Sequence, residues 1–305
     1  MPTPRPVGVS EELQIVDRDT LRLASRAPQL LSRLPDESFA AELKRSTVEI
    51  TTPASESLAQ LRRHVATLRG RAIGAAAELG LGVAAAGTAP LSSADDLEVT
   101  ARGRYSRMQQ DYRLLVDEHL VFGLQVHVGV DDADLAVRMI PRVERALPIL
   151  LALSASSPFW DGQDTGYASV RTTLWQRWPT AGRSEALESS AAYEAMISTL
   201  IASGVISDAN MAYFDVRPST DAASLELRVC DACPLVYDVV LVAGLFRAVV
   251  DHAAEAERAG VPRSVQPGAL YRAAMWRAAR SCRRRCSTVP PSPPPGRRPR
   301  WSEPW

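Results

Sequence analysis

Charged and amide side chains alternate with apolar ones in several short segments of this 305-residue chain. In a β-strand such alternation places the polar side chains on one face and the apolar side chains on the other. The polar set consists of Glu12, Glu49, Gln125, His127, Glu226 and Arg228. Three glutamates on separate strands would repel one another unless cations lay between them, and hard divalent cations take carboxylate oxygens as ligands. The set therefore predicts a metal-assisted reaction on one face of a sheet.

Arg228 narrows the chemistry, because it lies two residues from Glu226 and so shares its face of the strand. Its planar fork of donors suits phosphate or carboxylate groups. Carboxylates, a metal and an arginine together indicate phosphoryl transfer from ATP. The alternation alone has a second explanation, an ordinary antiparallel sheet with one face toward solvent.

Several other kinds of active site are not indicated by the sequence. It has no Walker-type glycine-lysine loop, no Gly-x-Ser-x-Gly elbow, and four histidines without the partner pattern of a hydrolytic triad. Two cysteine pairs, Cys230 with Cys233 and Cys282 with Cys286, have spacings that could serve zinc. Since the second pair lies in an arginine-rich segment with no sign of structure, ordinary thiols are the preferred interpretation.

The strands that must position the polar set are defined by the same alternation. Val7 to Val16 and Thr47 to Thr52 each predict one strand, and residues 122–130 predict another. Residues 214–217 and 225–230 predict two more, joined as a hairpin. Because only one face of each strand is apolar, we expect a sheet with one face packed under helices and one chemically active face.

The covering helices are predicted from apolar residues that recur every three or four positions, as they do over 58–79 and 236–258. Asp132 is a suitable N-cap for a helix that runs toward Leu153, in which Pro141 should force a break or kink. Strands and helices in this arrangement predict an α+β fold.

The composition favours a protein that works on small molecules. Lys+Arg and Asp+Glu both number 35. The chain therefore has no net positive charge that would attract nucleic acid or an anionic membrane. No window approaches the roughly 18 apolar residues of a membrane span, and no apolar signal sequence begins the chain, so a cytoplasmic location is expected. Residues 281–305 are rich in Pro and Arg and predict a disordered basic tail after a domain of residues 1–280.

A family resemblance runs in order from Gly8 to about Arg280. The opening Gly8-Val9-Ser10-Glu11-Glu12-Leu13 resembles the Gly-Val-Glu-Glu-Glu-Phe start of the glutamate-cysteine ligase type 2 (YbdK-like) carboxylate-amine ligases. Further matches are the segment Glu42 to Pro53 with its Val48-Glu49-Ile50, Arg104-Tyr105, Gly123 to Val130, Leu147 to Tyr167, Asp215 to Pro218, Leu225 to Asp231 and Tyr271 to Arg280.

The resemblance implies a catalytic domain like that of glutamine synthetase, a curved, mainly antiparallel sheet with helices on the outer face. It implies ATP and Mg²⁺ as cofactors, with Glu12, Glu42, Glu49 and Glu226 at magnesium-binding positions. Arg228 falls at the position that handles the transferred phosphate, and Gln125 and His127 lie near metal and nucleotide. The implied reaction joins a glutamate-like carboxylate to an amine such as cysteine through an acyl phosphate.

Four features depart from the family pattern. Ser10 replaces a glutamate of the opening motif, Gln125 replaces a histidine, and Ala89 stands where the family usually has histidine. The helical C-terminal portion that follows Arg280 in the family is absent. The alternative function is therefore a catalytically impaired or truncated homologue that binds nucleotide without ligase activity. The sequence leaves the oligomeric state open, a homodimer being one option.

Overall fold

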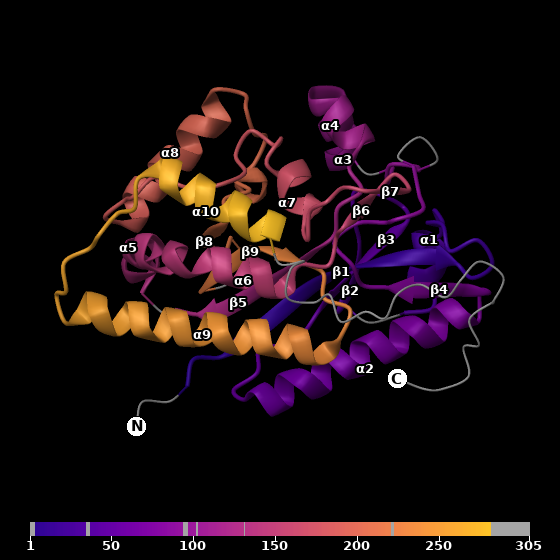
Figure 1. Cartoon of the computed structure of the whole chain (residues 1–305), viewed down its shortest axis with the longest axis horizontal. Helices are drawn as coiled ribbons and strands as arrows, with labels where there is room; N and C mark the ends of the chain where they lie inside the picture. Colours follow the sequence, from indigo (N-terminus) through magenta and orange to yellow (C-terminus); the bar gives the residue numbers. More distant parts are fainter. Residues whose placement is uncertain are drawn as a thin grey trace.

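In the computed structural model, which describes residues 4–34, 37–93, 97–101, 103–130, 132–220 and 223–281, the centre of the fold is an antiparallel sheet (Figure 1). Within these residues the strand order is β2-β3-β1-β5-β9-β8, and β4 pairs with the end of β1. The strands are β1 (Val7–Asp17), β2 (Phe39–Ala41), β3 (Thr47–Thr51), β4 (Leu81–Ala84), β5 (Gly123–Gly129), β8 (Val216–Pro218) and β9 (Ser224–Asp231). A separate short ribbon joins β6 (Phe159–Trp160) to β7 (Gln163–Asp164).

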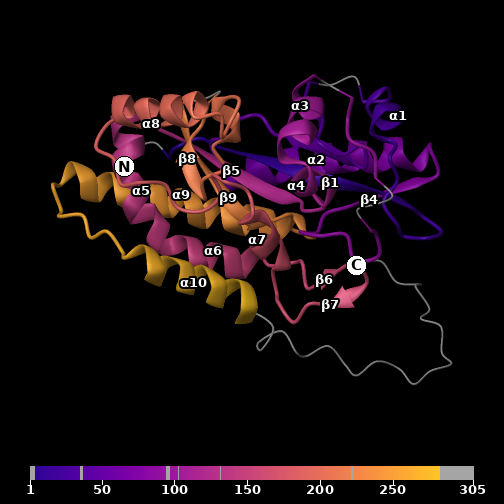
Figure 2. The same cartoon turned by 90° about the horizontal axis from the view of Figure 1, so that it is seen from above.

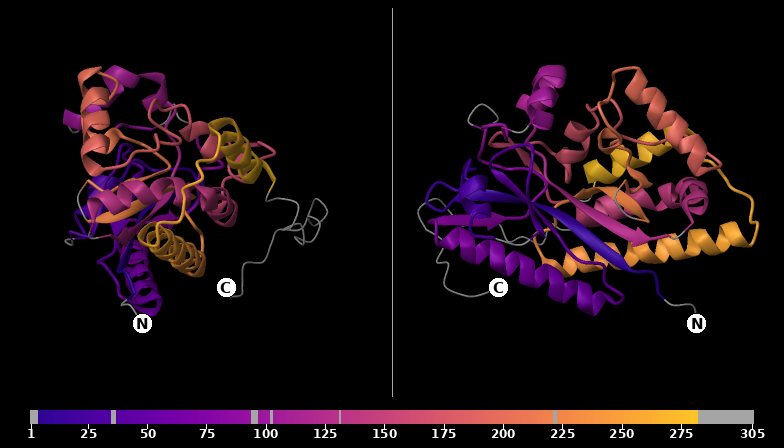
Figure 3. Two further views of the ribbon diagram at one scale, coloured as in Figure 1. Left: turned by 90° about the vertical axis from the view of Figure 1, so that its left-hand side faces the viewer. Right: turned by 180° about the vertical axis from the view of Figure 1, so that it is seen from behind.

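On the outer side of the sheet the described residues form a layer of helices with one further helix behind it. These helices are α2 (Leu58–Ala77), α5 (Ala133–Val143), α6 (Leu147–Ser154), α9 (Val236–Arg258) and α10 (Gly268–Ser281). Helices α2 and α9 lie side by side and contact β1, while α6 contacts β9 (Figures 1 and 3). Helix α10 packs on α6 and forms a second layer (Figure 2). The main core therefore lies between the sheet and these helices.

The opposite, inner face of the sheet lies under a cap of shorter elements. These are α3 (Gly103–Tyr112), α4 (Leu114–Asp117), α7 (Val170–Trp175), α8 (Ser190–Ala202) and the 3-10 turn Ala209–Met211. The short helix α1 (Ala27–Leu31) lies near the β2 edge of the sheet instead. The cap has its own apolar cluster, which includes Met108 and Trp178. The site is built between this cap and the sheet.

The first strand shows how the sequence pattern becomes a two-faced sheet. Its apolar residues Val9, Leu13 and Ile15 are buried under the helices, as the alternation predicted. Glu11 also points to that side, where its two carboxylate oxygens accept bonds of 2.6 and 3.1 Å from Arg69 of α2. A buried carboxylate on the apolar face is tolerated because it is paired and hydrogen-bonded.

The predicted strands and helices are confirmed, with one difference in detail. Asp132 caps α5 by accepting a 2.9 Å bond from the N–H of Leu135. Pro141 lies inside α5 without ending it, and the break comes three residues later, in a 3-10 turn over Glu144–Ala146. Pro141 removes one hydrogen bond to the turn before it, yet α5 continues to Val143, and α6 starts anew with Pro148 in its first turn.

Cys230 and Cys233 are buried free thiols on the core side. Cys282, Cys286 and the tail predicted to be disordered lie outside the described residues, apart from the final helical residue Ser281. Among the described helices, none is long and apolar enough to cross a membrane.

Candidate active site

The register of the sheet brings the predicted polar residues into one row across the inner face. Glu49 on β3 is opposite Glu12 on β1, and Gln125 on β5 is opposite Ser10 on β1. His127, also on β5, is opposite Glu226 on β9. Directly opposed residues share a face in an antiparallel pair, so neighbouring strands deliver these side chains to the same place.

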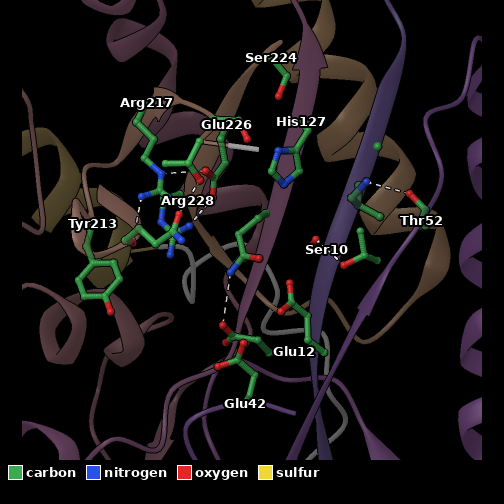
Figure 4. Close-up of a pocket in the computed structure, with 18 of the residues that line it drawn as sticks. Ser10, Glu12, Glu42, Thr52, His127, Tyr213, Arg217, Ser224, Glu226 and Arg228 are labelled. Atoms are coloured by element: carbon green, nitrogen blue, oxygen red, sulfur yellow. Dashed lines mark hydrogen bonds and ion pairs between the residues drawn. The ribbon is translucent and has the colours of Figure 1, made fainter. Parts of the chain in front are cut away.

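These side chains line a cavity of about 590 Å³ between the sheet and its cap. All seven predicted site residues line it, namely Glu12, Glu42, Glu49, Gln125, His127, Glu226 and Arg228. Glu12 and Glu42 lie toward one end in Figure 4, and Glu226 lies with Arg217 and Arg228 toward another.

The acidic end of the cavity contains Glu12, Glu42 and Glu49. Glu12 accepts a 2.6 Å bond from the N–H of Gly123 and a 3.3 Å bond from Gln125 Nε2. Burial and then the charges of Glu49 and Glu12 raise the pKa of Glu42 well above its ordinary value. Burial also raises the pKa of Glu12. Glu12 and Glu42 are therefore harder to ionise than free carboxyl groups, and a cation beside them would favour their charged forms.

The arginine end is organised around Glu226, whose two oxygens bind different arginines. Arg217 Nε donates to one oxygen at 2.8 Å, and Arg228 Nη1 donates to the other. Burial alone would raise the pKa of Glu226, but the charges of Arg228 and Arg217 outweigh it and lower the pKa to about 2. Glu226 is therefore ionised at neutral pH and bound to arginines, whereas Glu12, Glu42 and Glu49 have one another as neighbours.

The two arginines differ in how many of their donors the protein uses. Arg217 Nη1 donates to the backbone oxygens of Asn210 and Ala212, at 3.1 and 2.9 Å. Arg228 Nε is buried and has no partner in the described part of the chain. Among the described residues, the hydrogen bond that Arg228 makes is the one from Nη1 to Glu226, and the part of its side chain that stays exposed lines the cavity. That part of Arg228 can donate to a ligand in the cavity, whereas Arg217 is occupied by the protein.

His127 lies between the two ends, and burial lowers the pKa of its imidazole despite the charge of Glu226. The ring is therefore neutral at pH 7 and can accept or donate a hydrogen bond.

The cap contributes residues that the strand pattern did not identify. Arg104, His119, Trp175 and Tyr213 line the cavity from α3, from the segment after α4, from α7 and from the segment before β8. Arg104 belongs to the Arg104-Tyr105 match of the family resemblance. His119, Trp175 and Tyr213 lie in a short helix or in loops without a periodic signal, so their place at the cavity follows only from the fold. Arg217 was detectable, because it alternates with apolar neighbours on the strand paired with Glu226.

Comparison with known proteins identifies the family. The model of glutamate-cysteine ligase family 2 (GCS2) matches residues 6–285. The chain belongs to glutamate-cysteine ligase family 2. It is 53% identical over 280 residues to a provisionally named glutamate-cysteine ligase 2-2 of Mycolicibacterium smegmatis, covering 92% of this chain and 70% of that protein. It is 39% identical to a provisionally named glutamate-cysteine ligase 2 of Streptomyces coelicolor, covering 91% and 77%.

Some GCS2 relatives are much longer than this chain. It is 51% identical to a provisionally named ligase 2-3 of Rhodococcus jostii over 91% of its own length, but spans only 35% of that protein. For two Frankia relatives the corresponding share is 32%.

Two solved structures share the fold of this GCS2 chain. A bifunctional glutathione synthetase from Pasteurella multocida superposes with a TM-score of 0.67 at 15% identity, covering 91% of this chain and 42% of that one. A glutamate-cysteine ligase from Francisella tularensis in complex with AMP superposes with a TM-score of 0.67 at 11% identity, covering 90% of this chain and 70% of that one. These likenesses confirm the predicted fold class, a glutamine-synthetase-like α+β domain with an antiparallel sheet and helices on its outer face.

The position of the expected family glutamate is occupied by a hydroxyl group. Ser10 Oγ lies 3.0 Å from Thr51 Oγ1, and Thr52 Oγ1 accepts a bond from the N–H of Val9 nearby. This part of the GCS2 cavity is lined by hydroxyl groups, and its capacity for a cation is lower than that of the acidic end.

Among the described residues that line the cavity, carboxylates that suit magnesium are most concentrated at the acidic end. No three His, Cys, Asp or Glu side chains in the described residues already converge as a group that could hold a metal. This agrees with the usual habit of Mg²⁺, which is bound through one or two carboxylates together with substrate phosphates and water. The mutual crowding of Glu12, Glu42 and Glu49 is the feature that fits such an ion.

Proposed function

We propose that this chain is an ATP-dependent ligase that joins the carboxylate of a glutamate-like acid to an amine such as cysteine. The observation that carries the proposal is the division of one cavity into a crowded carboxylate end and an end where the partly exposed guanidinium of Arg228 lines the wall. The first end suits a divalent cation, and the second suits a phosphate group. Both requirements belong to phosphoryl transfer from ATP.

The proposed reaction has two steps. An oxygen of the substrate carboxylate attacks the γ-phosphorus of ATP, and the bond between the γ-phosphorus and the oxygen that bridges to the β-phosphate breaks. ADP departs with that oxygen, and the substrate carries the phosphate as an acyl phosphate. The amine nitrogen then attacks the acyl carbon, loses a proton, and expels inorganic phosphate to leave the amide. Arg228 stabilises the negative charge that develops on the transferring phosphate.

Glu12, Glu42 and Glu49 are the proposed magnesium ligands on the protein side. When bound there, the ion would neutralise charge on the phosphates and help to align them. For Glu226 we propose two roles. One is the predicted contact with magnesium, and the other is to orient Arg228, with which its carboxylate is paired. Gln125 and His127 contribute neutral polar groups between the two ends, where we propose that they contact the nucleotide.

A second candidate function is nucleotide binding without ligase activity. Ser10 favours it, because the missing carboxylate leaves part of the cavity without a cation ligand. A binding protein would show affinity for ATP but no turnover.

The test is a screen of amino acid and amine pairs for phosphate release from ATP, with detection of the amide by mass spectrometry. Release that requires both partners supports the ligase, and binding of ATP without release supports the second candidate. A cytoplasmic location, and a homodimer as one option for assembly, also belong to the proposal and are tested by cell fractionation and light scattering.

A further inference from the structure

The guanidinium of Arg228 lies over two aromatic rings of the cap. Its central carbon is 5.9 Å from the ring centre of Trp175 and 5.7 Å from that of Tyr213. The two rings contact each other, with centres 5.0 Å apart and planes inclined by 56°. We call Trp175 and Tyr213 the aromatic pair. A guanidinium at this distance from an aromatic ring is attracted by the negative ring face.

Glu226 alone does not explain how Arg228 is held. The carboxylate takes one terminal nitrogen, Nη1, and Nε has no partner within the described residues. Arg217, in contrast, is fixed by backbone oxygens as well as by Glu226. Among the described residues of the cap, the aromatic pair lies against the Arg228 guanidinium, which reaches the rings from β9.

The ring of Trp175 is itself tied to that strand. Ser169 caps α7 and donates a 2.8 Å bond to Asp231, which lies three residues after Arg228 on β9. The guanidinium of Arg171 lies 5.5 Å from the same indole, so Trp175 contacts a cation from α7 as well as Arg228. The helix therefore holds Trp175 at a defined place relative to Arg228.

We propose that Trp175 and Tyr213 are positioning residues, which hold the guanidinium of Arg228 so that the side of it that faces the cavity meets the transferring phosphate. The inference rests on the proposed ligase function and deepens it. It assigns to the rings a role through Arg228, with no contact of their own to the reacting atoms.

The test is a double-mutant cycle read by binding of an ATP analogue with a non-hydrolysable β,γ-imido bridge. The cycle compares the parent, W175L, R228Q and W175L/R228Q by titration calorimetry, with a parallel cycle for Y213L. We expect W175L to weaken binding roughly 3- to 30-fold when Arg228 is present, the range of a desolvated cation-π contact. In the R228Q background the same change should have less than about a twofold effect.

Conservative variants separate positioning from general damage to the cap. W175F and Y213F keep a ring face and should retain affinity within about threefold of the parent. In the ligase assay W175L should lower kcat more than it raises the KM of the acid, because Arg228 acts on the phosphate. Thermal unfolding of every variant shows which proteins are folded. If W175L does not fold, the cycle with Y213L replaces it.

The outcomes distinguish this inference from the proposed function. Equal loss of affinity with and without Arg228 would overturn the positioning role and leave the ligase proposal intact. Analogue binding that follows the cycle without any acid- and amine-dependent phosphate release would overturn the ligase proposal and leave the positioning role intact. A parent that does not bind the analogue would overturn both.

Discussion

At the scale of single residues, the contrast between Arg217 and Arg228 is the most informative feature of the site. Both pair with Glu226, but of the two only Arg217 also donates hydrogen bonds to backbone oxygens of the described residues. Two arginines on one carboxylate also leave a net positive charge at this end of the cavity. That charge suits a phosphate, and Arg228 is the arginine able to bind it.

Exchanging each arginine for lysine should separate these roles. In R228K a single ammonium cannot serve Glu226 and a phosphate together, so kcat should fall by about 10²- to 10³-fold with little loss of stability. R217K should instead lower the free energy of unfolding, by about 2–4 kcal/mol, because buried carbonyl groups lose their donors. Urea denaturation and initial rates measure both effects. An R228K protein as active as the parent would refute the phosphate role.

Ser10 gives a second prediction at this scale. Residues two apart on a strand project to the same side about 6–7 Å apart, so a glutamate at position 10 would lie beside Glu12. S10E should raise the apparent affinity for Mg²⁺ roughly tenfold by adding one charged ligand. S10Q has the same length without the charge and should leave the magnesium dependence unchanged. Equal behaviour of the two variants would show that the missing carboxylate does not limit the site.

The sequence predicted the strand residues of the site and missed the cap residues for one physical reason. Alternation on β1, β3, β5 and β9 determines which side chains share a face, so Glu12 and Glu226 could be placed without a structure. The pairing of Glu226 with two arginines depends on strand order, which alternation does not determine. Trp175 and Tyr213 reach the cavity from α7 and from a segment without regular structure, where no period exists to read.

At the scale of elements, a buried polar cluster joins the outer helices to the strand that carries Arg217. Glu144 accepts a 2.8 Å bond from Arg183, and Tyr271 of α10 donates a 2.6 Å bond to Asp215, two residues before Arg217. The Arg183 guanidinium lies 5.9 Å from the Tyr271 ring centre, which links the two pairs. Helix α10 thus contacts the back of the site through the hydroxyl group of Tyr271, and its Ala279 oxygen also accepts a bond from the N–H of Ser169 at the start of α7.

The cluster should make stability depend on pH through Glu144. Burial raises its pKa from 4.5 to about 7 despite Arg183, and its second carboxylate oxygen, Oε1, has no partner among the described residues. A carboxyl whose folded pKa exceeds its unfolded value stabilises the fold fully below the unfolded pKa, and this contribution is lost as the pH rises through the folded pKa.

The variant E144Q cannot ionise and serves as the reference for this effect. The stability of the parent relative to E144Q should therefore fall by about 1–3 kcal/mol between pH 4.5 and pH 8. Urea denaturation of both proteins at the two pH values measures the difference. A constant difference would show that folding leaves the pKa of Glu144 unchanged.

At the scale of the whole molecule, apolar periodicity was enough to predict a sheet with one covered face. Val9 and Leu13 on β1 and Val239 and Phe246 on α9 occupy the buried positions that their spacing required. The order of the strands and the second layer formed by α10 could not be read in this way. Both depend on contacts between segments far apart in the chain, such as Tyr271 with Asp215.

The last prediction concerns the C-terminal boundary of the folded domain. Tyr271, Met275 and Ala279 of α10 are buried in the main core, whereas residues 282–305 are rich in Pro and Arg and offer no apolar stripe. Deleting residues 282–305 should change the free energy of unfolding by no more than about 0.5 kcal/mol, the range of surface changes. Deleting residues 267–305 should cost several kcal/mol or prevent folding, because Met275 alone contributes about 2–5 kcal/mol of packing.

Urea denaturation of the two truncated chains beside the parent measures both effects. The longer deletion also removes the hydroxyl group that binds Asp215, so it should weaken binding of the ATP analogue through Arg217 and Glu226, while the shorter one should not. A loss of more than about 2 kcal/mol on removing residues 282–305 alone would exceed the range of surface changes. It would show that the segment packs on the domain, and the predicted boundary near residue 280 would then be wrong.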